Sequence, residues 1–298
     1  MKIIVAICTW NRAALLTQTL ENMLNLKSDA SFSWELLIVN NNCTDDTDKV
    51  IAEFSGLLPI RRIFEPTPGL SNARNAAVRN ATGDYIVWTD DDVLVDSDWL
   101  LAYARAFREW PDAAVFGGPI TPWFEGEPPP WLKESWHVVS AAFAVRDLGD
   151  EPIPLSVEEG IVPFGANFAV RMAEQRRHLY DPNLGLNAGK VVLGEESQVI
   201  AAIMAEGFSG RWVPDAKVKH WLPKGRQTLE YLKKYYYGAG RTRKLQVTAI
   251  GDEIGQIWLA RRYLGLCLRY LCSRLFDPPI VWVELLSRRS FAKGRIFG

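Results

Sequence analysis

YIVWTDDDVL, residues 85–94, joins an apolar run to three consecutive aspartates. The apolar half is typical of a strand buried in a sheet, because aromatic and β-branched residues favour strands. Three adjacent carboxylates repel one another, and burying even one unpaired charge costs several kcal/mol. Other parts of the chain should therefore supply groups that compensate Asp90, Asp91 and Asp92.

Strand-like and helix-like segments alternate along the first part of the chain. Short apolar runs predict strands at residues 2–8, 34–39, 60–64 and 85–88. Helical patterns predict helices at residues 13–25, 49–54, 71–80 and 99–109. This alternation predicts an α/β fold, with a mainly parallel sheet and helices on both faces.

Polar clusters follow three of the predicted strands. They are Thr9–Arg12, Asn40–Thr47 and Asp90–Asp92. In open α/β sheets, ligands bind outside the carboxyl ends of the strands. The coincidence of three polar strand ends therefore predicts a ligand site at this edge of the sheet.

The middle of the chain is less regular. Residues 119–131 (PITPWFEGEPPPW) contain five prolines and three large aromatic residues, so we expect a surface loop rather than a helix or central strand. Residues 161–171 (IVPFGANFAVR) predict a strand interrupted by a Gly-Ala-Asn turn. Glu195 and Glu196 open a predicted helix that reaches residue 205, and residues 217–221 predict a short strand.

Charge is distributed unevenly along the chain. Residues 217–298 hold 17 Lys and Arg against 5 Asp and Glu, whereas residues 1–216 hold 17 against 30. From residue 228 onward the pattern is helical, with basic residues between Tyr, Trp and Leu. We therefore expect a catalytic domain over residues 1–225 and a basic, amphipathic helical segment over residues 226–298.

The basic segment has three interpretations. It can contact a membrane surface or a lipid-linked substrate, because amphipathic cationic helices lie in membrane interfaces. It can pack on the catalytic domain with a solvated basic face, or it can bind nucleic acid. The acidic remainder of the chain would repel a duplex, so we expect no nucleic-acid partner. Peripheral membrane contact fits the composition best.

The chain carries no signal for export or for crossing a membrane. Its four cysteines have neither metal-ligand spacing nor a dense disulfide pattern. Met1 and Lys2 run directly into a predicted strand, which is not the pattern of a signal peptide. No apolar run approaches the roughly 20 residues that span a bilayer. We expect a cytoplasmic protein, peripheral at the inner face of the cell membrane.

The aspartate triplet has a plain and a functional interpretation. As a solvated turn it would cap the next helix. As a metal site it would hold Mg²⁺ or Mn²⁺ through one or two carboxylates together with phosphate oxygens. A triplet exceeds what capping needs, and the chain has neither a G-x-x-x-x-G-K-[ST] loop nor a G-x-G-x-x-G motif after its first strand. Phosphate binding by a metal and an arginine such as Arg74 is the remaining arrangement.

Four blocks of sequence together resemble the family-two glycosyltransferases. They are ICTWNR (7–12), IVNNNCTDDT (38–47), GLSNARNAAVRNATGDYIVWTDDD (69–92) and GEES (194–197). The resemblance implies the GT-A fold, a mixed and mainly parallel sheet flanked by helices. It also implies an enzyme that uses a nucleoside-diphosphate sugar and usually inverts the anomeric configuration.

Carried over position by position, the resemblance implies a role for each site residue. It places Thr9, Asn11 and Arg12 beside the nucleotide, Asn40 against the nucleobase, Arg74 at the base or diphosphate, and Asn167 in the loop that shapes the sugar and acceptor site. Asp90 and Asp92 form the D-x-D pair that contacts ribose and metal respectively, and Asp91 is a rival for either role. His220 is a further ligand of the metal or diphosphate.

Several of these roles have alternatives. Glu196 is implied as the general base, but the family's Glu-Asp pair is Glu195-Glu196 here, so Glu195 is a second candidate. Both acids also suit a helix N-terminus by charge alone. Asn40 replaces a usual Asp, which leaves the nucleobase open, with a UDP-sugar favoured. Asn167 can equally be a turn residue, and His220 a packed one.

The predicted function is transfer of a sugar from a nucleoside-diphosphate sugar to a hydroxyl of a glycan or lipid-linked acceptor. The transfer would be a single inverting displacement with Mg²⁺ or Mn²⁺ and one carboxylate base. A nucleotidyltransferase is the nearest rival, but such enzymes usually carry a Gly-rich basic loop after the first strand. A catalytically silent nucleotide-sugar-binding module is the other alternative.

Overall fold

The computed structural model describes residues 1–187, 190–192, 194–250 and 255–298. One unit comprises the described residues within 1–122, 144–188 and 195–221. A second unit comprises those within 123–143, 189–194 and 222–298. The domain boundary expected after residue 225 stays a prediction.

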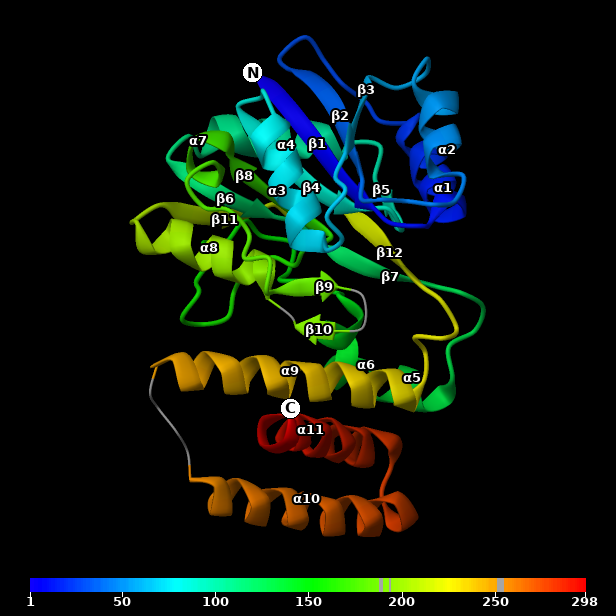
Figure 1. Ribbon diagram of the computed structural model, residues 1–298, viewed down its shortest axis with the longest axis vertical. Coiled ribbons are helices and arrows are strands. Elements are labelled where there is room, and N and C mark those ends of the chain that lie inside the picture. Colours follow the sequence, from blue (N-terminus) through cyan, green and yellow to red (C-terminus); the bar gives the residue numbers. More distant parts are fainter. Residues whose placement is uncertain (188–189, 193, 251–254) are drawn as a thin grey trace. The chain divides into compact units, whose positions relative to one another are not determined.

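The sheet of the first unit is centred on β1 (Lys2–Thr9), whose apolar run was predicted to be a strand. β1 pairs in parallel with β2 (Ser33–Asn40) on one side and with β4 (Tyr85–Asp90) on the other. The seven strands follow the order β11-β6-β8-β4-β1-β2-β3 (Figure 1). β8 (Asn167–Arg171) runs antiparallel to both β4 and β6. The mixed, mainly parallel sheet is confirmed.

The remaining elements of the first unit include predicted and unpredicted ones. They are α1 (Ala13–Met23), α2 (Thr47–Phe54), β3 (Ile60–Phe64), α3 (Leu70–Asn80), β5 (Val93–Val95), α4 (Trp99–Glu109), β6 (Ala113–Gly117), β7 (Ile120–Phe124), α7 (Met172–Gln175), β9 (Gly185–Asn187), α8 (Glu195–Ala205), β11 (Ser209–Trp212) and β12 (Val218–Leu222). The bounds of β3 and α4 agree with the predicted ones.

Helices cover both faces of this sheet because successive side chains of a strand point to opposite faces. Ile3, Val5 and Ile7 of β1 belong to one apolar core, together with buried residues of α1, α2 and α4. Ile4 and Ala6 belong to a second core, together with residues of α3 and α8. Burial of β1 on both faces explains why it reads as a continuous apolar run.

Two expectations for the middle of the chain are wrong in part. Residues 120–124 are strand β7 rather than loop, and the order β5-β12-β7 puts β7 at the edge of a small sheet. An edge strand tolerates Pro122, which has no N–H to donate. In the predicted strand 161–171, only β8 joins the sheet. Pro163 cannot donate to a ladder, and the backbone N–H of Asn167 instead closes a turn onto the Phe164 carbonyl.

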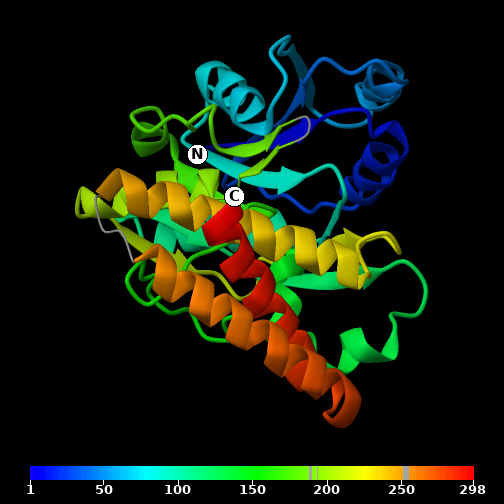
Figure 2. The same ribbon diagram turned by 60° about the horizontal axis from the view of Figure 1, so that its bottom comes forward.

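The second unit consists mainly of helices, as the sequence predicts for its C-terminal part. It contains α5 (Pro130–Glu134), α6 (Trp136–Val139), the 3₁₀ turn η1 (Ser140–Phe143), strand β10 (Lys190–Val192), α9 (Leu229–Ile250), α10 (Gln256–Phe276) and α11 (Pro279–Phe297). Figures 1 and 2 both show α11 beside α9 and α10, and it packs on both. Within the described residues, no helix is long and apolar enough to cross a membrane.

Two glycines allow α9 and α11 to approach closely. A Cβ on Gly240 would lie 2.1 Å from the Phe291 carbonyl oxygen, and one on Gly294 would lie 2.0 Å from the Tyr237 carbonyl oxygen. Such distances are far inside van der Waals contact, so any side chain would force the helices apart. The crossing of α9 and α11 is therefore in direct backbone contact.

Candidate active site

Strand register brings the three predicted polar clusters to one edge of the sheet. Cys8 of β1 lies opposite Asp90 of β4, and Thr9 lies opposite Asn40 of β2. The residues that follow these strands therefore meet at the carboxyl ends of three adjacent parallel strands. This is the position where open α/β sheets bind ligands.

Arg12 and Thr9 compensate part of the aspartate triplet. One guanidinium nitrogen of Arg12 lies 2.9 Å from Asp91 Oδ1 and 2.8 Å from Asp92 Oδ2. The Thr9 hydroxyl donates to Asp91 Oδ2 at 2.7 Å, and the Thr19 hydroxyl donates to the Asp91 carbonyl at 2.9 Å. Thr19 was not predicted, because its contact joins residues 72 positions apart. Asp91 is thus held on the protein side by three groups.

Asp90, Asp92 and His220 form a cluster that fits a divalent cation. One ligand atom from each lies within 4.8 Å of the others, and His220 Nε2 is 3.5 Å from Asp92 Oδ1. The pairing of β12 with β5 places His220 opposite Val93, directly after the triplet. Two carboxylates and an imidazole are suitable ligands for a divalent cation such as Mn²⁺. The predicted metal ligands Asp92 and His220 lie in this cluster, and Asp90, predicted to contact ribose, lies in it too; their roles stay predictions.

Burial dominates the titration of the triplet. It raises the pKa of Asp91 to about 7, with Arg12 acting in the opposite direction and Asp92 adding to the rise. It also raises the pKa of Asp90, to which the Asp92 charge contributes. For Arg12 burial acts to lower the pKa, but Asp91 and Asp92 outweigh it and raise the pKa. The site therefore favours binding positive charge.

Arg74 of α3 holds the two acids at the start of α8. Its Nη1 lies 3.2 Å from Glu195 Oε1 and 3.9 Å from Glu196 Oε2. A Cβ on Gly165 would lie 2.9 Å from Arg74 Nη2 and 3.3 Å from Glu196 Oε1, so this glycine leaves room for the group. The Arg74 guanidinium is buried against these acids. Its predicted contact with the donor stays a prediction.

The Glu195 carboxyl has a raised pKa at this position. Burial raises the pKa of Glu195 to about 7; the Glu196 charge adds to the rise, and Arg74 opposes it. For Arg74, burial acts to lower the pKa, but Glu195, Tyr180 and Glu196 outweigh it and raise the pKa. The Asp90 charge contributes to both shifts, which links the acid pair to the aspartate cluster.

This shift predicts a pH-dependent stability difference. The Glu195 pKa is higher in the folded chain than its ordinary value of 4.5. The protonated carboxyl therefore contributes stability below pH 4.5, and this contribution is lost as pH rises through about 7. Relative to wild type, Glu195→Gln should gain about 1–3 kcal/mol in free energy of unfolding between pH 5 and 8. Urea unfolding of both proteins at several pH values measures this; a constant difference would contradict the shift.

The Asn167 side chain is buried and hydrogen-bonded in the core, and its predicted contact with the donor stays a prediction. Its Oδ1 accepts from Trp99 Nε1 at 2.9 Å and from the Tyr103 hydroxyl at 2.8 Å. Its Nδ2 donates to the carbonyls of Pro119 at 3.0 Å and Ala216 at 2.6 Å. The side chain is fully buried and all four of its hydrogen-bonding positions are used. We assign Asn167 a role in packing.

Asn167→Ala should lower the free energy of unfolding by about 3–5 kcal/mol. The substitution removes the partner of two buried donors and of the Ala216 carbonyl, whereas the Pro119 carbonyl still accepts from the Val218 N–H. Each buried group left without a partner costs about 1–3 kcal/mol. Urea unfolding followed by tryptophan fluorescence measures the loss. Asn72→Ala is the control, because Asn72 makes a local bond to the Pro68 carbonyl on an exposed surface. Equal stability of the two variants would show that the amide is not needed.

The predicted nucleotide residues Asn11 and Asn40 organise the loop after β2. Asn11 Oδ1 accepts from the Thr44 N–H at 2.7 Å, and Asn11 itself has a positive φ of 53°. Asn40 Nδ2 donates to Asp48 Oδ1 at 2.6 Å, and its Oδ1 accepts from the Cys43 N–H at 2.8 Å. Their contacts with a nucleotide stay predictions. The side chain of Asp48 was not predicted to take part.

The fold is similar to that of a solved mannosyltransferase, PcManGT from Pyrobaculum calidifontis, determined in complex with GDP-Man and Mn²⁺. The likeness covers 97% of this chain and 69% of that chain, with a TM-score of 0.56 and 17% sequence identity. At this identity the likeness shows the fold alone. The protein has the GT-A fold of glycosyltransferases.

Sequence comparison carries the assignment further. Residues 4–147 match the model of glycosyl transferase family 2. The chain is 23% identical over 269 residues to the succinoglycan biosynthesis protein ExoM of Rhizobium meliloti, covering 88% of this chain and 82% of that protein. It is 24% identical over 299 residues to a glucosyl-dolichyl phosphate glucuronosyltransferase of Haloferax volcanii, covering 96% and 91%. The family 2 match and these two relatives identify the chain as a glycosyltransferase.

Proposed function

We propose that this enzyme transfers a sugar from a nucleoside-diphosphate sugar to a hydroxyl of a glycan or lipid-linked acceptor, by a single inverting displacement that depends on a divalent cation. The observation that carries the proposal is the pairing of the Asp90–Asp92–His220 cluster with the acid pair on α8. The first suits a metal and diphosphate, and the second suits proton removal from the acceptor. The family 2 match favours this reaction over nucleotidyl transfer and over a silent binding module.

Asp90, Asp92 and His220 would hold the cation. When bound, it supplies positive charge that stabilises the departing nucleoside diphosphate. Arg12 would keep the Asp91 and Asp92 carboxylates in place. The mixed oxygen and nitrogen ligands favour Mn²⁺ over Mg²⁺, because Mg²⁺ is bound almost entirely by oxygen. The mannosyltransferase of similar fold was solved with Mn²⁺.

Glu196 would take the proton of the acceptor hydroxyl. Its side chain is 18% exposed and lies farther from Arg74, whereas that of Glu195 is 8% exposed and lies closer. The more accessible carboxylate is the better candidate for contact with an acceptor. Glu195 and Arg74 would then act as positioning residues that fix the Glu196 side chain. A single displacement needs no nucleophilic side chain, and measuring the anomeric configuration of the product tests it.

Donor identity is tested by thermal shift with UDP, GDP, CDP and dTDP, each with and without Mn²⁺. A UDP-sugar is the first candidate for the donor. We expect one diphosphate to stabilise the chain only with the metal, by about 2.7 kcal/mol at a concentration 100 times its Kd. If none of the four diphosphates gives a metal-dependent shift, the proposal is contradicted.

The acceptor would be a growing polysaccharide or a lipid-linked saccharide. One relative is named for succinoglycan biosynthesis, and another for transfer to a glucosyl-dolichyl phosphate. Both point to a growing saccharide rather than a protein side chain. Incubating the enzyme with radiolabelled donor and lipid-linked saccharides, and then partitioning label into organic solvent, tests this assignment.

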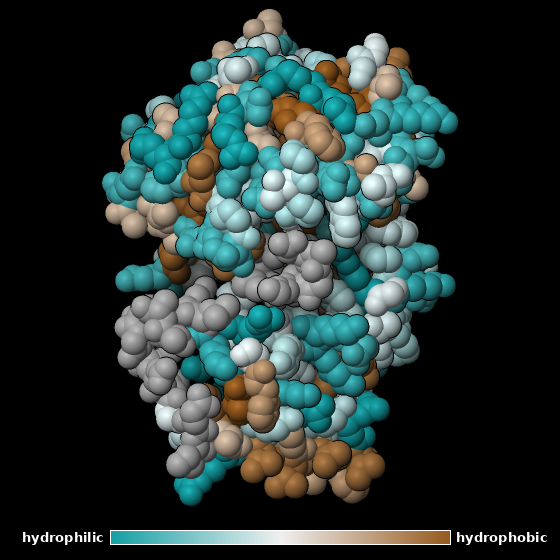
Figure 3. Space-filling model, viewed as in Figure 1, coloured by the Kyte–Doolittle hydropathy of each residue, from teal (hydrophilic) through white to brown (hydrophobic). Residues whose placement is uncertain are grey.

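Peripheral membrane contact is proposed through α10. Four leucines at spacings of four, three and four residues lie on one exposed face of this helix: Leu264, Leu268, Leu271 and Leu275, which are 60–77% exposed. The opposite face is buried through Leu259 and Leu266. Figure 3 shows brown residues gathered at the lower end of the view, where Figure 1 places α10. The helix carries four arginines and no acid, so its charge matches an anionic bilayer.

The double variant Leu268→Glu/Leu271→Glu should float poorly with vesicles containing anionic lipid, whereas wild type should float with them. Each leucine transferred from water to the acyl region contributes about 1.5–3 kcal/mol, so the pair contributes about 3 kcal/mol or more. Leu57→Glu is the matched control, because Leu57 is a leucine 66% exposed in the first unit. Flotation of the double variant at the wild-type level would argue against membrane contact through α10.

A further inference from the structure

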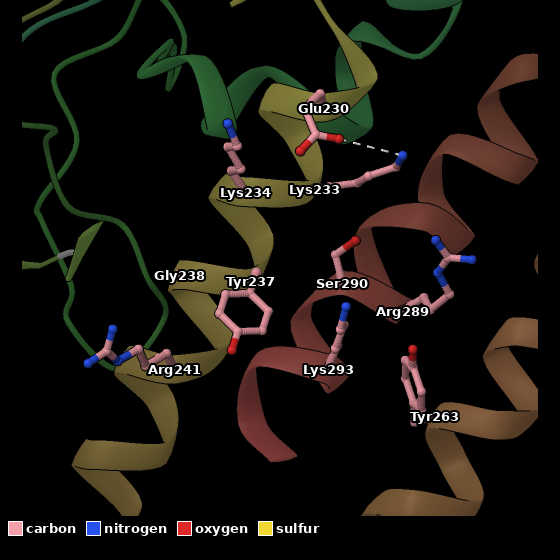
Figure 4. Close-up of a pocket in the computed structure, with 10 residues that line it drawn as sticks. All are labelled: Glu230, Lys233, Lys234, Tyr237, Gly238, Arg241, Tyr263, Arg289, Ser290 and Lys293. Carbon is pink, nitrogen blue, oxygen red and sulfur yellow. Dashed lines mark ion pairs between the residues drawn. The ribbon is translucent and has the colours of Figure 1, made fainter. Parts of the chain in front are cut away.

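A pocket of about 650 Å³ lies among the three C-terminal helices, within the second unit. Its lining comes from α9, α10 and α11: Glu230, Lys233, Lys234, Tyr237, Gly238, Arg241, Tyr263, Arg289, Ser290 and Lys293 (Figure 4). None of these residues takes part in the site at the carboxyl edge of the sheet.

The pocket lining is strongly cationic. It contains five Lys and Arg side chains and one carboxylate, that of Glu230, which lies 3.8 Å from Lys233 Nζ. Among the described residues, no carboxylate lies within ion-pair distance of the other four cations of the lining. Like charges that line one pocket repel each other, and a bound anion would relieve that repulsion.

The walls of the pocket are fixed by contacts that do not involve a ligand. The α9–α11 crossing is in backbone contact at Gly240 and Gly294. The Tyr237 hydroxyl donates to the Phe297 carbonyl at 3.1 Å, and the Arg289 guanidinium lies 4.5 Å from the centre of the Tyr270 ring. An ordinary solvated basic face would have long, free side chains on a convex surface. In Figure 4, Lys233, Arg289 and Lys293 lie on one side of α9 together with Tyr263 of α10, whereas Lys234 and Arg241 extend from α9 away from α11.

We propose that this pocket binds a phosphate or diphosphate group. Guanidinium and ammonium groups together are the protein's usual partners for phosphate oxygens, and the Ser290 hydroxyl adds a neutral donor. The volume leaves room for whatever group the phosphate carries. Two kinds of ligand carry such a group: a lipid with a phosphate headgroup, and a soluble phosphate compound. The inference does not rest on the proposed transfer reaction or on its metal.

The test uses the full chain and inorganic pyrophosphate, measured by calorimetry in 150 mM salt with EDTA. Salt weakens non-specific attraction, and EDTA removes divalent cations from the donor site. We expect saturable binding that Arg289→Gln/Lys293→Gln weakens about tenfold or more, because it removes two charged donors. The matched control is Lys224→Gln/Arg243→Gln, which removes the same charge from exposed positions outside the pocket and outside α10.

A second arm separates these two kinds of ligand. Sedimentation with phosphatidic-acid vesicles is compared with phosphatidylserine vesicles of matched surface charge. A loss by the pocket variant that is confined to phosphatidic acid assigns the site to a lipid phosphate. A loss confined to pyrophosphate assigns it to a soluble ligand. If pocket and control variants weaken both probes equally, or neither, with the wild-type thermal melting temperature retained, the proposal is overturned.

Discussion

Replacing Glu196 by glutamine is expected to lower kcat for sugar transfer by about 10²–10⁴-fold, the usual contribution of a general base. Glutamine keeps the size of the side chain but cannot accept the proton of the acceptor hydroxyl. Donor binding should stay at the wild-type level, because Glu196 does not belong to the cluster of Asp90, Asp92 and His220. Initial rates measure the first effect, and thermal shift with the nucleoside diphosphate measures the second.

Glu195→Gln is the matched control for this experiment. It makes the same chemical change one residue away, at a side chain that is more buried and closer to Arg74. We expect a smaller loss of rate, within about tenfold, because Glu195 acts through Glu196. A full loss for Glu195→Gln with normal turnover for Glu196→Gln would exchange the two roles.

Asp92→Asn is expected to remove the Mn²⁺-dependent shift by the nucleoside diphosphate and to lower kcat/KM by about 10³-fold. A metal contributes several kcal/mol of charge stabilisation, and each 1.36 kcal/mol is tenfold in rate. Asp92 is one of two carboxylates in the cluster, and the other residues cannot replace its charge. Titration with Mn²⁺ at fixed diphosphate concentration measures the effect.

Asp91→Asn is the control for Asp92→Asn, because it removes a negative charge from the triplet without removing a proposed metal ligand. Asp91 is the middle acid of the triplet, and it is held by Thr9 and Arg12 rather than by the cluster. Its raised pKa means that a neutral amide is tolerated there better than at most buried acids. Its Mn²⁺ dependence should therefore remain close to wild type. Loss of the metal effect in Asp91→Asn, with retention in Asp92→Asn, would contradict the proposed ligand set.

Much of the first unit could be predicted from local pattern. The strand at 60–64 and the helix at 99–109 have the predicted bounds, because clear breaks flank each of them and the helix also has a strong apolar period. Strands β5, β6 and β11 were missed. They have three to five residues each, too few to show a period, and they become strands only through partners far along the chain.

The candidate site could likewise be predicted only in part from the sequence. Polar residues after adjacent strands could be placed together, since parallel strands end at a common edge. The Arg74–Glu195 ion pair could not, because its residues are 121 positions apart on different helices. Nor could the chemistry of Asn167 be read from its neighbours in IVPFGANFAVR. Its four bonding partners lie 48–68 positions away, and only the packed fold decides that the amide is buried.

Asn167 also has a consequence for the cost of ligand binding. Its Nδ2 anchors the Ala216 carbonyl, two residues before strand β12, and β12 carries His220. This bond fixes the backbone just before β12 before any ligand arrives. Less backbone freedom then remains to be lost there when the donor complex forms, so a larger part of the contact energy is available as affinity. A buried amide can in this way contribute to how tightly the ligand binds.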